Sequence, residues 1–239
     1  MNSIPLLSVI IPVFNAARYL RQAVESVLDQ QHPNIEVLIV DDGSTDNSLK
    51  VAASFGHPII SVQQDNMGAG AARNHGLRLC TGEMIAFLDA DDVWLQGKIQ
   101  AQLAMVQERS ADLVFGLAEE FLSTECTPDG AKFLVRHAPR PGLITSAALF
   151  PRSTLQRVGY LDETLIVGEF LDWYARFKEQ GLQEAVVDQV VCRRRIHQHN
   201  LGIRKKSASK DYVRVMKNAL DRRRLASDAT AKDGGKDVL

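Results

Sequence analysis

Short apolar runs alternate with helical patterns through the first half of the chain. Each run is rich in strand-forming residues and too short for a helix, so each predicts a strand. The runs cover residues 6–13, 35–42, 58–64 and 83–90. Strands that are apolar on both faces and separated by helices are typical of a parallel sheet. We therefore predict an α/β fold in which a mixed, mostly parallel sheet lies between helices.

The segments between these strands predict helices. The first carries apolar residues at helical spacing from Leu20 to Leu28, and the second covers residues 44–55. Asn15 is expected to cap the first helix and Ser44 the second. Two further helices are predicted, one over the Ala-rich residues 68–79 and one through Ile99, Leu103 and Val106.

Polar residues follow each of the four predicted strands. In open α/β sheets, ligands bind outside the carboxyl ends of the strands. Because parallel strands end at the same edge, we expect one binding rim there, built from residues 14–15, 41–46, 64–66 and 89–92.

The second half of the chain is less regular. Residues 112–122 predict a strand, 127–130 a turn, and 184–197 a strand or a hairpin. Residues 168–182 predict a helix with an aromatic side. Trp173 and Tyr174 on that side either belong to the core or stack on the ring of a bound substrate.

Length and composition fit one globular domain with a C-terminal appendage. The chain has 239 residues, of which 45% are hydrophobic and 24% are charged. No stretch reaches the roughly 20 apolar residues of a membrane span, and the N-terminus lacks the basic start of a signal peptide. The three cysteines are scattered and form no CxxC pair, which argues against a zinc site or a disulfide frame. We therefore expect a cytoplasmic protein.

Basic residues are concentrated near the C-terminus. The formal net charge of the whole chain is −1, but residues 193–224 alone carry +10. An amphipathic basic helix is predicted over 207–224, followed by a disordered tail over 225–239. The helix either docks on the rest of the protein or, with the preceding RRR and RKK runs, contacts an anionic membrane surface. No nucleic-acid partner is expected, because no aromatic–basic platform accompanies these charges.

Three carboxylates follow the fourth predicted strand, at Asp89, Asp91 and Asp92. Like charges this close repel each other unless something positive lies between them. Asp89 and Asp91 are spaced to lie on one side of an extended chain. Hard oxygen ligands on a binding rim suit Mg²⁺ or Mn²⁺, which bridge carboxylates to phosphate oxygens. A turn or a helix cap would explain one of the three, such as Asp92.

Two other motifs fit less well. DADDV (89–93) fits the nucleophile motif of haloacid-dehalogenase-like phosphatases, in which Asp89 would be phosphorylated, but that motif normally ends the first strand. This phosphatase class is the runner-up. GAGAAR (68–73) is close to a dinucleotide fingerprint, but Arg73 occupies the third glycine position.

Four motifs, in this order and spacing, resemble those of the family 2 glycosyltransferases: SVIIPVFN (8–15), VDDGSTDNS (40–48), NMGAGAARN (66–74) and FLDADD (87–92). The resemblance covers roughly residues 6–110 and extends loosely to about residue 200. It implies a GT-A fold over 1–206, with a nucleotide-binding part (1–110) and an acceptor part (111–206).

The implied activity is transfer of a sugar from a nucleotide-diphosphate sugar, more often a UDP-sugar, to an acceptor hydroxyl, mostly with inversion and with Mg²⁺ or Mn²⁺. The acceptor would be a saccharide, a lipid-linked molecule or a peptide. Metal contacts are implied for Asp91 and, among the two histidines of RRRIHQHN, for His197 rather than His199. Nucleotide contacts are implied for Pro12, Phe14, Asn15, Asp42, Arg73 and Asp89.

The region expected to supply the general base departs from the family pattern. In GEFLDWYAR (168–176), Phe170 occupies the position at which we expect the base. Glu169 and Asp172 are the alternatives, and Asp172 can instead be a structural partner of Arg176, one helical turn further on. Phe170 also leaves open a catalytically degenerate module that only binds nucleotide sugars.

Overall fold

The computed structural model describes residues 4–124, 135, 138–198, 200 and 209–233. Its strands are β1 (Leu7–Val13), β2 (Ile35–Asp41), β3 (Ile59–Gln63), β4 (Met84–Phe87), β5 (Val93–Trp94), β6 (Leu113–Leu122), β7 (Arg140–Pro141), β8 (Ala148–Pro151) and β9 (Glu184–Ile196). In the described part of the chain they form one sheet in the order β3-β2-β1-β4-β8-β6-β9-β5, and the short β7 pairs with β6.

The first half of the sheet is parallel. β1 lies between β2 and β4 and is parallel to both, and β2 is parallel to β3. β8 is antiparallel to β4 and β6, whereas β9 is parallel to β6. These pairings confirm the predicted mixed, mostly parallel sheet. They also confirm the five strands predicted before residue 125.

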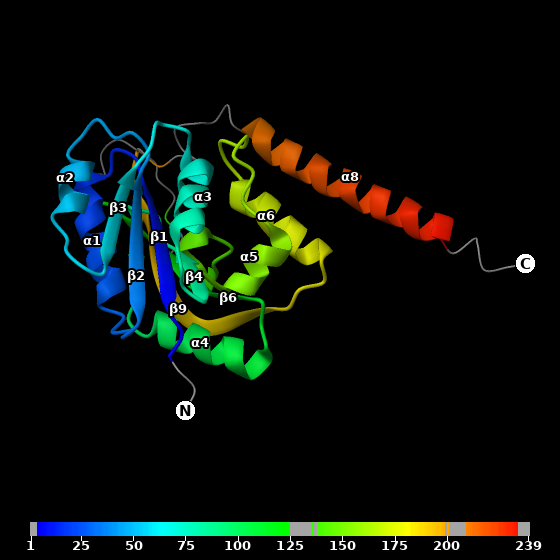
Figure 1. The fold of residues 1–239 in the computed structure, drawn as a ribbon, viewed down its shortest axis with the longest axis horizontal. Helices are drawn as coiled ribbons and strands as arrows, with labels where there is room; N and C mark the ends of the chain where they lie inside the picture. The colour runs from blue at the N-terminus through cyan, green and yellow to red at the C-terminus, as the bar shows by residue number, and fades with distance from the viewer. Residues whose placement is uncertain (1–3, 125–134, 136–137, 199, 201–208, 234–239) are drawn as a thin grey trace, which may run out of the picture.

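Helices cover both faces of the sheet (Figure 1). They are α1 (Ala17–Leu28), α2 (Ser48–Ala53), α3 (Ala69–Leu79), α4 (Lys98–Arg109), α5 (Arg152–Val158), α6 (Glu169–Glu179) and α8 (Ser209–Asp233), with a 3₁₀ turn, η1 (Thr145–Ala147). On one face, α1 packs through Leu20 on the odd-numbered residues of β1. On the other face, Leu77 of α3 and Trp173 of α6 share a core with Ile10 of β1. Since successive strand residues point to opposite faces, every residue of β1 except Ser8 is apolar because both faces of the strand are buried.

A glycine sets the distance between α3 and β1. A Cβ built on Gly76 would lie 2.5 Å from Cγ2 of Ile10, so only glycine fits here without displacing the helix or the strand. This close approach fixes the position of Arg73, which lies on α3 three residues earlier.

Both predicted helix caps are wrong. The N-cap position of α1 is Ala16 and that of α2 is Asn47. Asn15 has a φ of +52°, and its side-chain oxygen accepts a hydrogen bond from the backbone N–H of Thr45 (2.8 Å). Ser44 Oγ in turn accepts one from the backbone N–H of Asn15 (2.9 Å). These polar side chains join the loops after β1 and β2 to each other instead of capping helices.

Sequence patterns missed β5 at the end of the first half and the short elements of the second half, namely β7, β8, η1 and α5. They have two to seven residues each, too few for a periodicity to be visible. The segment predicted as a strand or a hairpin at 184–197 is one long strand, β9, and the helix predicted at 168–182 is α6. The predicted turn at 127–130 lies outside the described residues.

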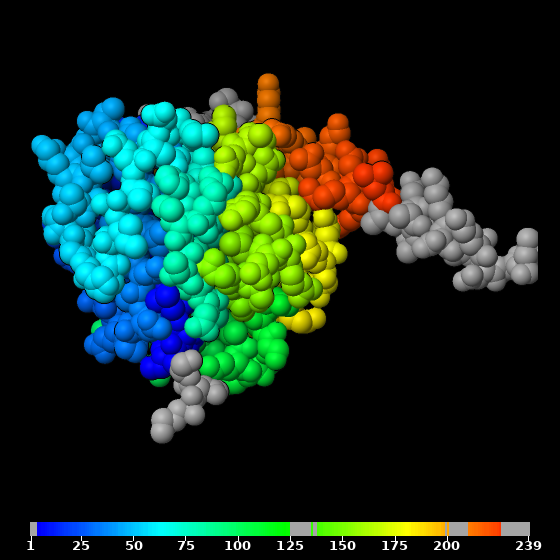
Figure 2. Space-filling view, in the orientation of Figure 1, coloured from blue at the N-terminus to red at the C-terminus, as the bar shows by residue number. Residues whose placement is uncertain are grey.

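The C-terminal helix is longer than predicted. α8 continues to Asp233, so the prediction of a disordered tail is wrong for residues 225–233. Residues 234–239 lie outside the described part. α8 begins at the upper edge of the molecule, lies along α6 and extends past the body (Figures 1 and 2). Val215 in its first half is 2% exposed, which confirms that this half docks on the protein. No helix in the described residues has the length and apolar character needed to cross a membrane.

Candidate functional site

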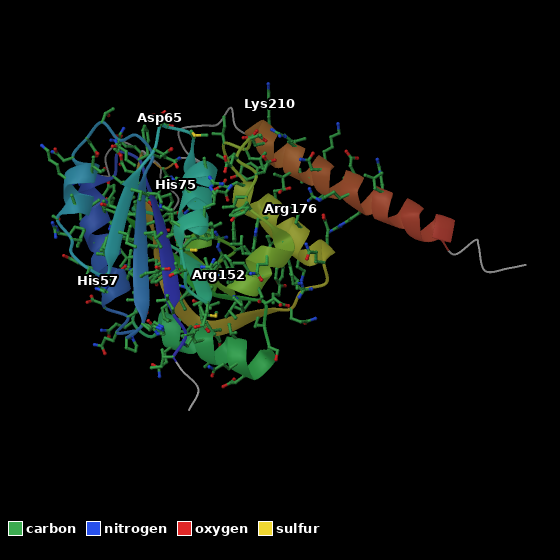
Figure 3. The ribbon with its side chains drawn as sticks, in the orientation of Figure 1. His57, Asp65, His75, Arg152, Arg176 and Lys210 are labelled. Carbon is green, nitrogen blue, oxygen red and sulfur yellow. The ribbon has the colours of Figure 1, made fainter. Side chains whose placement is uncertain are left out.

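A cavity of about 790 Å³ lies at the carboxyl ends of the parallel strands. Asp65, just after β3, marks this edge in Figure 3. Each residue predicted to contact nucleotide or metal lies on the cavity wall: Pro12, Phe14, Asn15, Asp42, Arg73, Asp89, Asp91 and His197. The structure therefore brings these predicted residues together. It does not bring Glu169 or Asp172 to the wall.

Arg73 connects the end of β4 to the start of α6. Its side chain is 5% exposed, Nη2 donates to Asp89 Oδ1 (2.6 Å), and Nη1 donates to Glu169 Oε1 (2.5 Å). Burial lowers the pKa of Arg73, but the two carboxylates outweigh burial and raise that pKa above its ordinary value. Arg73 is therefore a permanent cation between the aspartate cluster and α6. Its buried Nε has no hydrogen-bond partner within the described residues.

Asp91 has partners just beyond the end of β9. Its Oδ2 lies 2.8 Å from His197 Nε2 and accepts a hydrogen bond from Asn200 Nδ2 (3.2 Å). His197 is 4% exposed, and its ring centroid lies 4.9 Å from that of Tyr19. The structure thus places His197 against Asp91, as the predicted shared metal role requires. His199 lies outside the described residues.

Asp92 is buried next to the other two carboxylates. Ser146 Oγ donates to one oxygen (2.8 Å), and the backbone N–H of Arg195 donates to the other (3.0 Å). Burial raises the pKa of Asp92 well above its ordinary value, and the charges of the neighbouring aspartates raise it further. The predicted turn is present, because the backbone N–H of Asp92 donates to the carbonyl oxygen of Asp89 (3.0 Å). The predicted capping role is wrong, because the N-cap of α4 is Gly97.

The three carboxylates therefore have different protein partners, so a metal ion is not required to explain why they lie together. No group of three or more His, Cys, Asp or Glu side chains in the described residues could hold a metal. Mg²⁺, however, usually binds one or two carboxylates plus substrate phosphates, with no cage made only of protein. Asp91 on the cavity wall is a carboxylate of the kind that this mode of binding requires, and His197 lies beside it on the same wall.

Asp42 organises the loop before α3. Its Oδ1 accepts hydrogen bonds from Gln64 Nε2 (2.8 Å) and from the backbone N–H of Met67 (2.9 Å), and its Oδ2 accepts one from that of Gly68 (2.9 Å). An ionised carboxylate has about four acceptor sites. A nucleotide base would use the remaining one, and this contact stays a prediction.

The two candidate bases on α6 have different surroundings. Glu169 is linked to the cavity wall through Arg73. Asp172 is tied elsewhere, because its Oδ2 accepts from Arg176 Nε (2.9 Å) and its Oδ1 accepts from Arg222 Nη1 of α8 (3.2 Å). These contacts match the alternative role of Asp172, that of a structural partner of Arg176.

The aromatic side of α6 belongs to the core. Trp173 is 2% exposed, its Nε1 donates to the carbonyl oxygen of Gly159 (2.8 Å), and its ring stacks on Phe170 and Phe177. Sugar stacking is therefore wrong for Trp173. The hydroxyl of Tyr174 donates to Glu184 Oε2 (2.5 Å).

The RRR run lies within β9. Arg193 pairs with Glu119 (2.8 Å) and Arg194 with Glu120 (3.4 Å), both on β6. Arg195 Nε donates to the carbonyl oxygen of Asp91 (2.9 Å). These contacts give the run a role in the sheet and the site, and they do not support its predicted role in membrane contact. The RKK run (204–206) lies outside the described residues.

Sequence reasoning missed several residues of the site. Thr145 Oγ1 donates to Asp89 Oδ1 (3.2 Å), and Ser146 Oγ accepts from the backbone N–H of Asp89 (3.1 Å). Both belong to η1, whose sequence gave no pattern. Asn200 carried a signal, because it stands three residues after His197 in the same polar stretch.

Comparisons with known proteins agree with this arrangement. Residues 8–124 match the family model described as glycosyl transferase family 2. An uncharacterised glycosyltransferase of Rickettsia prowazekii is 30% identical over 211 residues, which are 81% of this chain and 64% of that protein. Glycosyltransferase GlyG of Streptococcus pneumoniae is 39% identical over 115 residues, 46% of this chain and 38% of GlyG. The chain thus spans less than two thirds of the length of either relative.

Solved structures share the fold. Staphylococcus aureus TarS (1–349) in complex with UDP has a TM-score of 0.67 and 21% identity, and the match covers 90% of this chain and 64% of that one. The mannosyltransferase PcManGT of Pyrobaculum calidifontis, in complex with GDP-Man and Mn²⁺, has a TM-score of 0.71 and 18% identity over 91% of this chain and 64% of that one. The predicted GT-A type of fold is confirmed.

Proposed function

Because the chain belongs to glycosyl transferase family 2, we propose that it transfers a sugar from a nucleotide-diphosphate sugar, preferably a UDP-sugar, to an acceptor hydroxyl. One observation carries the proposal: a single cavity has on its wall the residues of all four motifs together with Asp91 and His197. Its volume of about 790 Å³ lies within the range of small-molecule sites. Two fold neighbours were solved with UDP and with GDP-Man, which supports a nucleotide-sugar donor. Family and fold together favour this activity over the phosphatase alternative.

Arg73 would act on the donor from the floor of the cavity. The Arg73 guanidinium is charged at all relevant pH values. Its buried Nε has no hydrogen-bond partner within the described residues, so this donor is available to a bound ligand. Because Asp89 already holds one edge of the guanidinium, Arg73 is oriented before the donor arrives. A fixed cation of this kind favours the negative charge that develops on the departing diphosphate.

Asp91 and His197 are the residues that would hold a divalent ion, Mg²⁺ or Mn²⁺. When bound there, such an ion neutralises charge on the diphosphate as a Lewis acid. Asn200 would orient the Asp91 carboxylate, to which it donates a hydrogen bond. The PcManGT neighbour, solved with Mn²⁺, supports the assignment.

Glu169 is our choice for the general base of an inverting transfer. Both oxygens of Asp172 are engaged by arginines, Arg176 of α6 and Arg222 of α8, whereas Glu169 adjoins the cavity wall through Arg73. In this assignment, Arg73 orients the Glu169 carboxylate, which accepts the proton of the acceptor hydroxyl as the new bond forms. The acceptor would be a saccharide, a lipid-linked molecule or a peptide.

A second candidate function is a module that binds nucleotide sugars without transferring them. The observation that favours it is Phe170: at the position expected for the base, its side chain is 8% exposed and packs in the core with Trp173. Donor binding alone therefore does not distinguish the two candidates, and a test of turnover is needed.

Calorimetric titration of UDP with and without Mn²⁺ tests donor binding. We expect binding that Mn²⁺ strengthens by tenfold or more, and Asp91→Asn should remove this Mn²⁺ effect. Asp65→Asn is the matched control, because Asp65 is exposed at the same edge but is not on the cavity wall. No UDP binding in either condition would refute the donor assignment.

A screen of UDP- and GDP-sugars for Mn²⁺-dependent hydrolysis tests turnover without a known acceptor. Release of nucleoside diphosphate that Asp91→Asn abolishes and Asp65→Asn retains supports the transferase. UDP binding without hydrolysis of any donor would instead support the binding module.

A further inference from the structure

One apolar surface of the molecule is unexplained by the proposed activity. The side chains of Val213, Met216 and Leu220 on α8 are 61%, 57% and 53% exposed. At 3.6 residues per turn, these three positions form one stripe along the helix. We call them the outer stripe of α8.

The outer stripe lies opposite the docked face of the same helix. On the docked face, Val215 is 2% exposed, and Arg222 donates to Asp172 and to Glu179 (2.7 Å). Asp211 accepts hydrogen bonds from the backbone N–H groups of Ile166 (2.9 Å) and Val167 (3.3 Å). α8 is therefore held in one orientation, and the helix turns its outer stripe away from the protein.

Basic residues flank the outer stripe. By helical position, Lys217 and Arg224 lie on one side of it and Arg223 lies on the other, and all three are exposed. Within residues 210–225, whose side chains are described, the acids are Asp211 and Asp221. Asp211 is engaged by the docked loop, and Asp221 lies beyond Lys217, away from the stripe. An apolar stripe with cations on both sides is complementary to a bilayer surface that carries negative charge.

We propose that the outer stripe of α8 and its flanking cations bind the surface of a membrane that contains anionic lipids. A helix of this type lies in the plane of the interface with its apolar residues among the acyl chains and its cations at the headgroups. The proposal does not depend on the identity of the donor sugar.

The placement of α8 connects this surface to the cavity. Ile166, which receives a backbone contact from Asp211, also lines the cavity and is 52% exposed. Lys210, at the start of α8, lies at the same edge of the molecule as Asp65, and its side chain points away from the body (Figure 3). Membrane binding through α8 would therefore bring the bilayer surface close to the mouth of the cavity, where the proposed transfer would meet a lipid-linked acceptor.

Co-sedimentation of the full chain with vesicles tests the proposal. We expect binding to phosphatidylcholine vesicles that contain about 30% phosphatidylglycerol, weak binding to pure phosphatidylcholine, and release from the anionic vesicles as salt is raised from about 0.1 M to about 0.5 M. Lys217→Gln and Arg223→Gln should each weaken binding by about fivefold.

Met216→Ser combined with Leu220→Ser should weaken vesicle binding by tenfold or more. Ile60→Thr combined with Leu143→Ser is the matched control, because these side chains are 48% and 55% exposed but lie away from α8. Circular dichroism of each variant checks that the helix content is unchanged.

Three outcomes would overturn the proposal. The first is no sedimentation with anionic vesicles, and the second is equal loss of binding in the stripe and control variants. The third is a dimer, measured by light scattering, that the stripe variant dissociates while vesicles bind neither form. That last result would assign the stripe to a second copy of the chain.

Discussion

Lys98 offers a quantitative test of how burial in this fold changes the pKa of a lysine and the stability of the protein. Its side chain is fully buried at the start of α4, where Nζ donates to Gln102 Oε1 and to the carbonyl oxygen of Ala148 (3.5 Å) and lies 4.5 Å from the ring centroid of Trp94. Burial lowers the pKa of Lys98 from 10.5 to about 7, although the neighbouring Cys192 acts in the opposite direction. The folded protein therefore tolerates the neutral amine much better than the ammonium.

The direction of the pH effect follows from this shift. Between about pH 7 and pH 10.5, the unfolded chain carries the Lys98 proton and the folded chain does not, so the free energy of unfolding increases with pH. Below pH 7 both states are protonated, and the folded protein bears the full cost of the buried charge. A shift of this size corresponds to at most about 5 kcal/mol, with a slope of up to about 1.4 kcal/mol per pH unit inside the window.

Lys98→Met removes the buried amine and keeps a similar length of side chain. The variant leaves Gln102 and Ala148 without a donor, which costs about 1–3 kcal/mol. At pH 6.5 we therefore expect Lys98→Met to be more stable than the wild type by about 2–4 kcal/mol, and this advantage should disappear or reverse near pH 10.

Urea denaturation at several pH values between 6 and 10 measures the effect. The control is Lys178→Met, because the side chain of Lys178 is 43% exposed. The control should stay within about 0.5 kcal/mol of the wild type throughout. If Lys98→Met is less stable than the wild type at pH 6.5 and its stability changes with pH in the same way, the folded protein keeps Lys98 charged up to pH 10 and the argument fails.

Two further predictions concern the chemistry and the packing. Glu169→Gln should lower turnover by 100-fold or more and change UDP affinity less than threefold. Asp172→Asn should instead lower the free energy of unfolding by about 1–3 kcal/mol and retain the turnover of the folded enzyme. Hydrolysis assays and denaturation of both variants test this, and the reverse pattern would make Asp172 the base. Gly76→Ala should destabilise the protein by about 1–3 kcal/mol because its Cβ meets Ile10, whereas Gly56→Ala, which meets nothing within 4 Å, should be close to neutral in thermal melts. Equal effects of the two alanine substitutions would contradict the close packing of α3 on β1.

The nucleotide half of the fold could be predicted from the sequence because local and global signals agree there. β1 is apolar apart from Ser8 because both of its faces are buried, with Val9 facing one core and Ile10 the other. Parallel strands then place the loops that follow them on one edge, so the binding rim could be predicted without knowing any contact. The roles of single residues, and the inclusion of Pro12 and Arg73, came from the family resemblance. In the second half, the longer elements β6, α6 and β9 gave such a signal, but β8 and η1 did not. β8 has four residues and is defined by its pairing with β4 and β6, and η1 is a three-residue turn.

The partners of the predicted residues were the part that sequence could not give. Asp172 illustrates this, since the one local partner visible in the sequence was Arg176, while Arg222 reaches it from α8, fifty residues further on in the chain. The same limit applied to Asn15, which satisfies the capping pattern but bonds to the loop after β2.

The aspartate cluster shows why this matters for mechanism. Three carboxylates within four residues, considered alone, demand a positive ion between them. In the fold they are separated chemically: Asp89 faces Arg73, Asp91 faces His197, and Asp92 is buried against a hydroxyl and a backbone N–H. Burial and the neighbouring aspartates raise the pKa of Asp92 well above its ordinary value, so its environment disfavours a third negative charge. The protein contacts of the cluster therefore account for its folding, and in the proposed function a divalent ion would serve the donor diphosphate and not the stability of the loop.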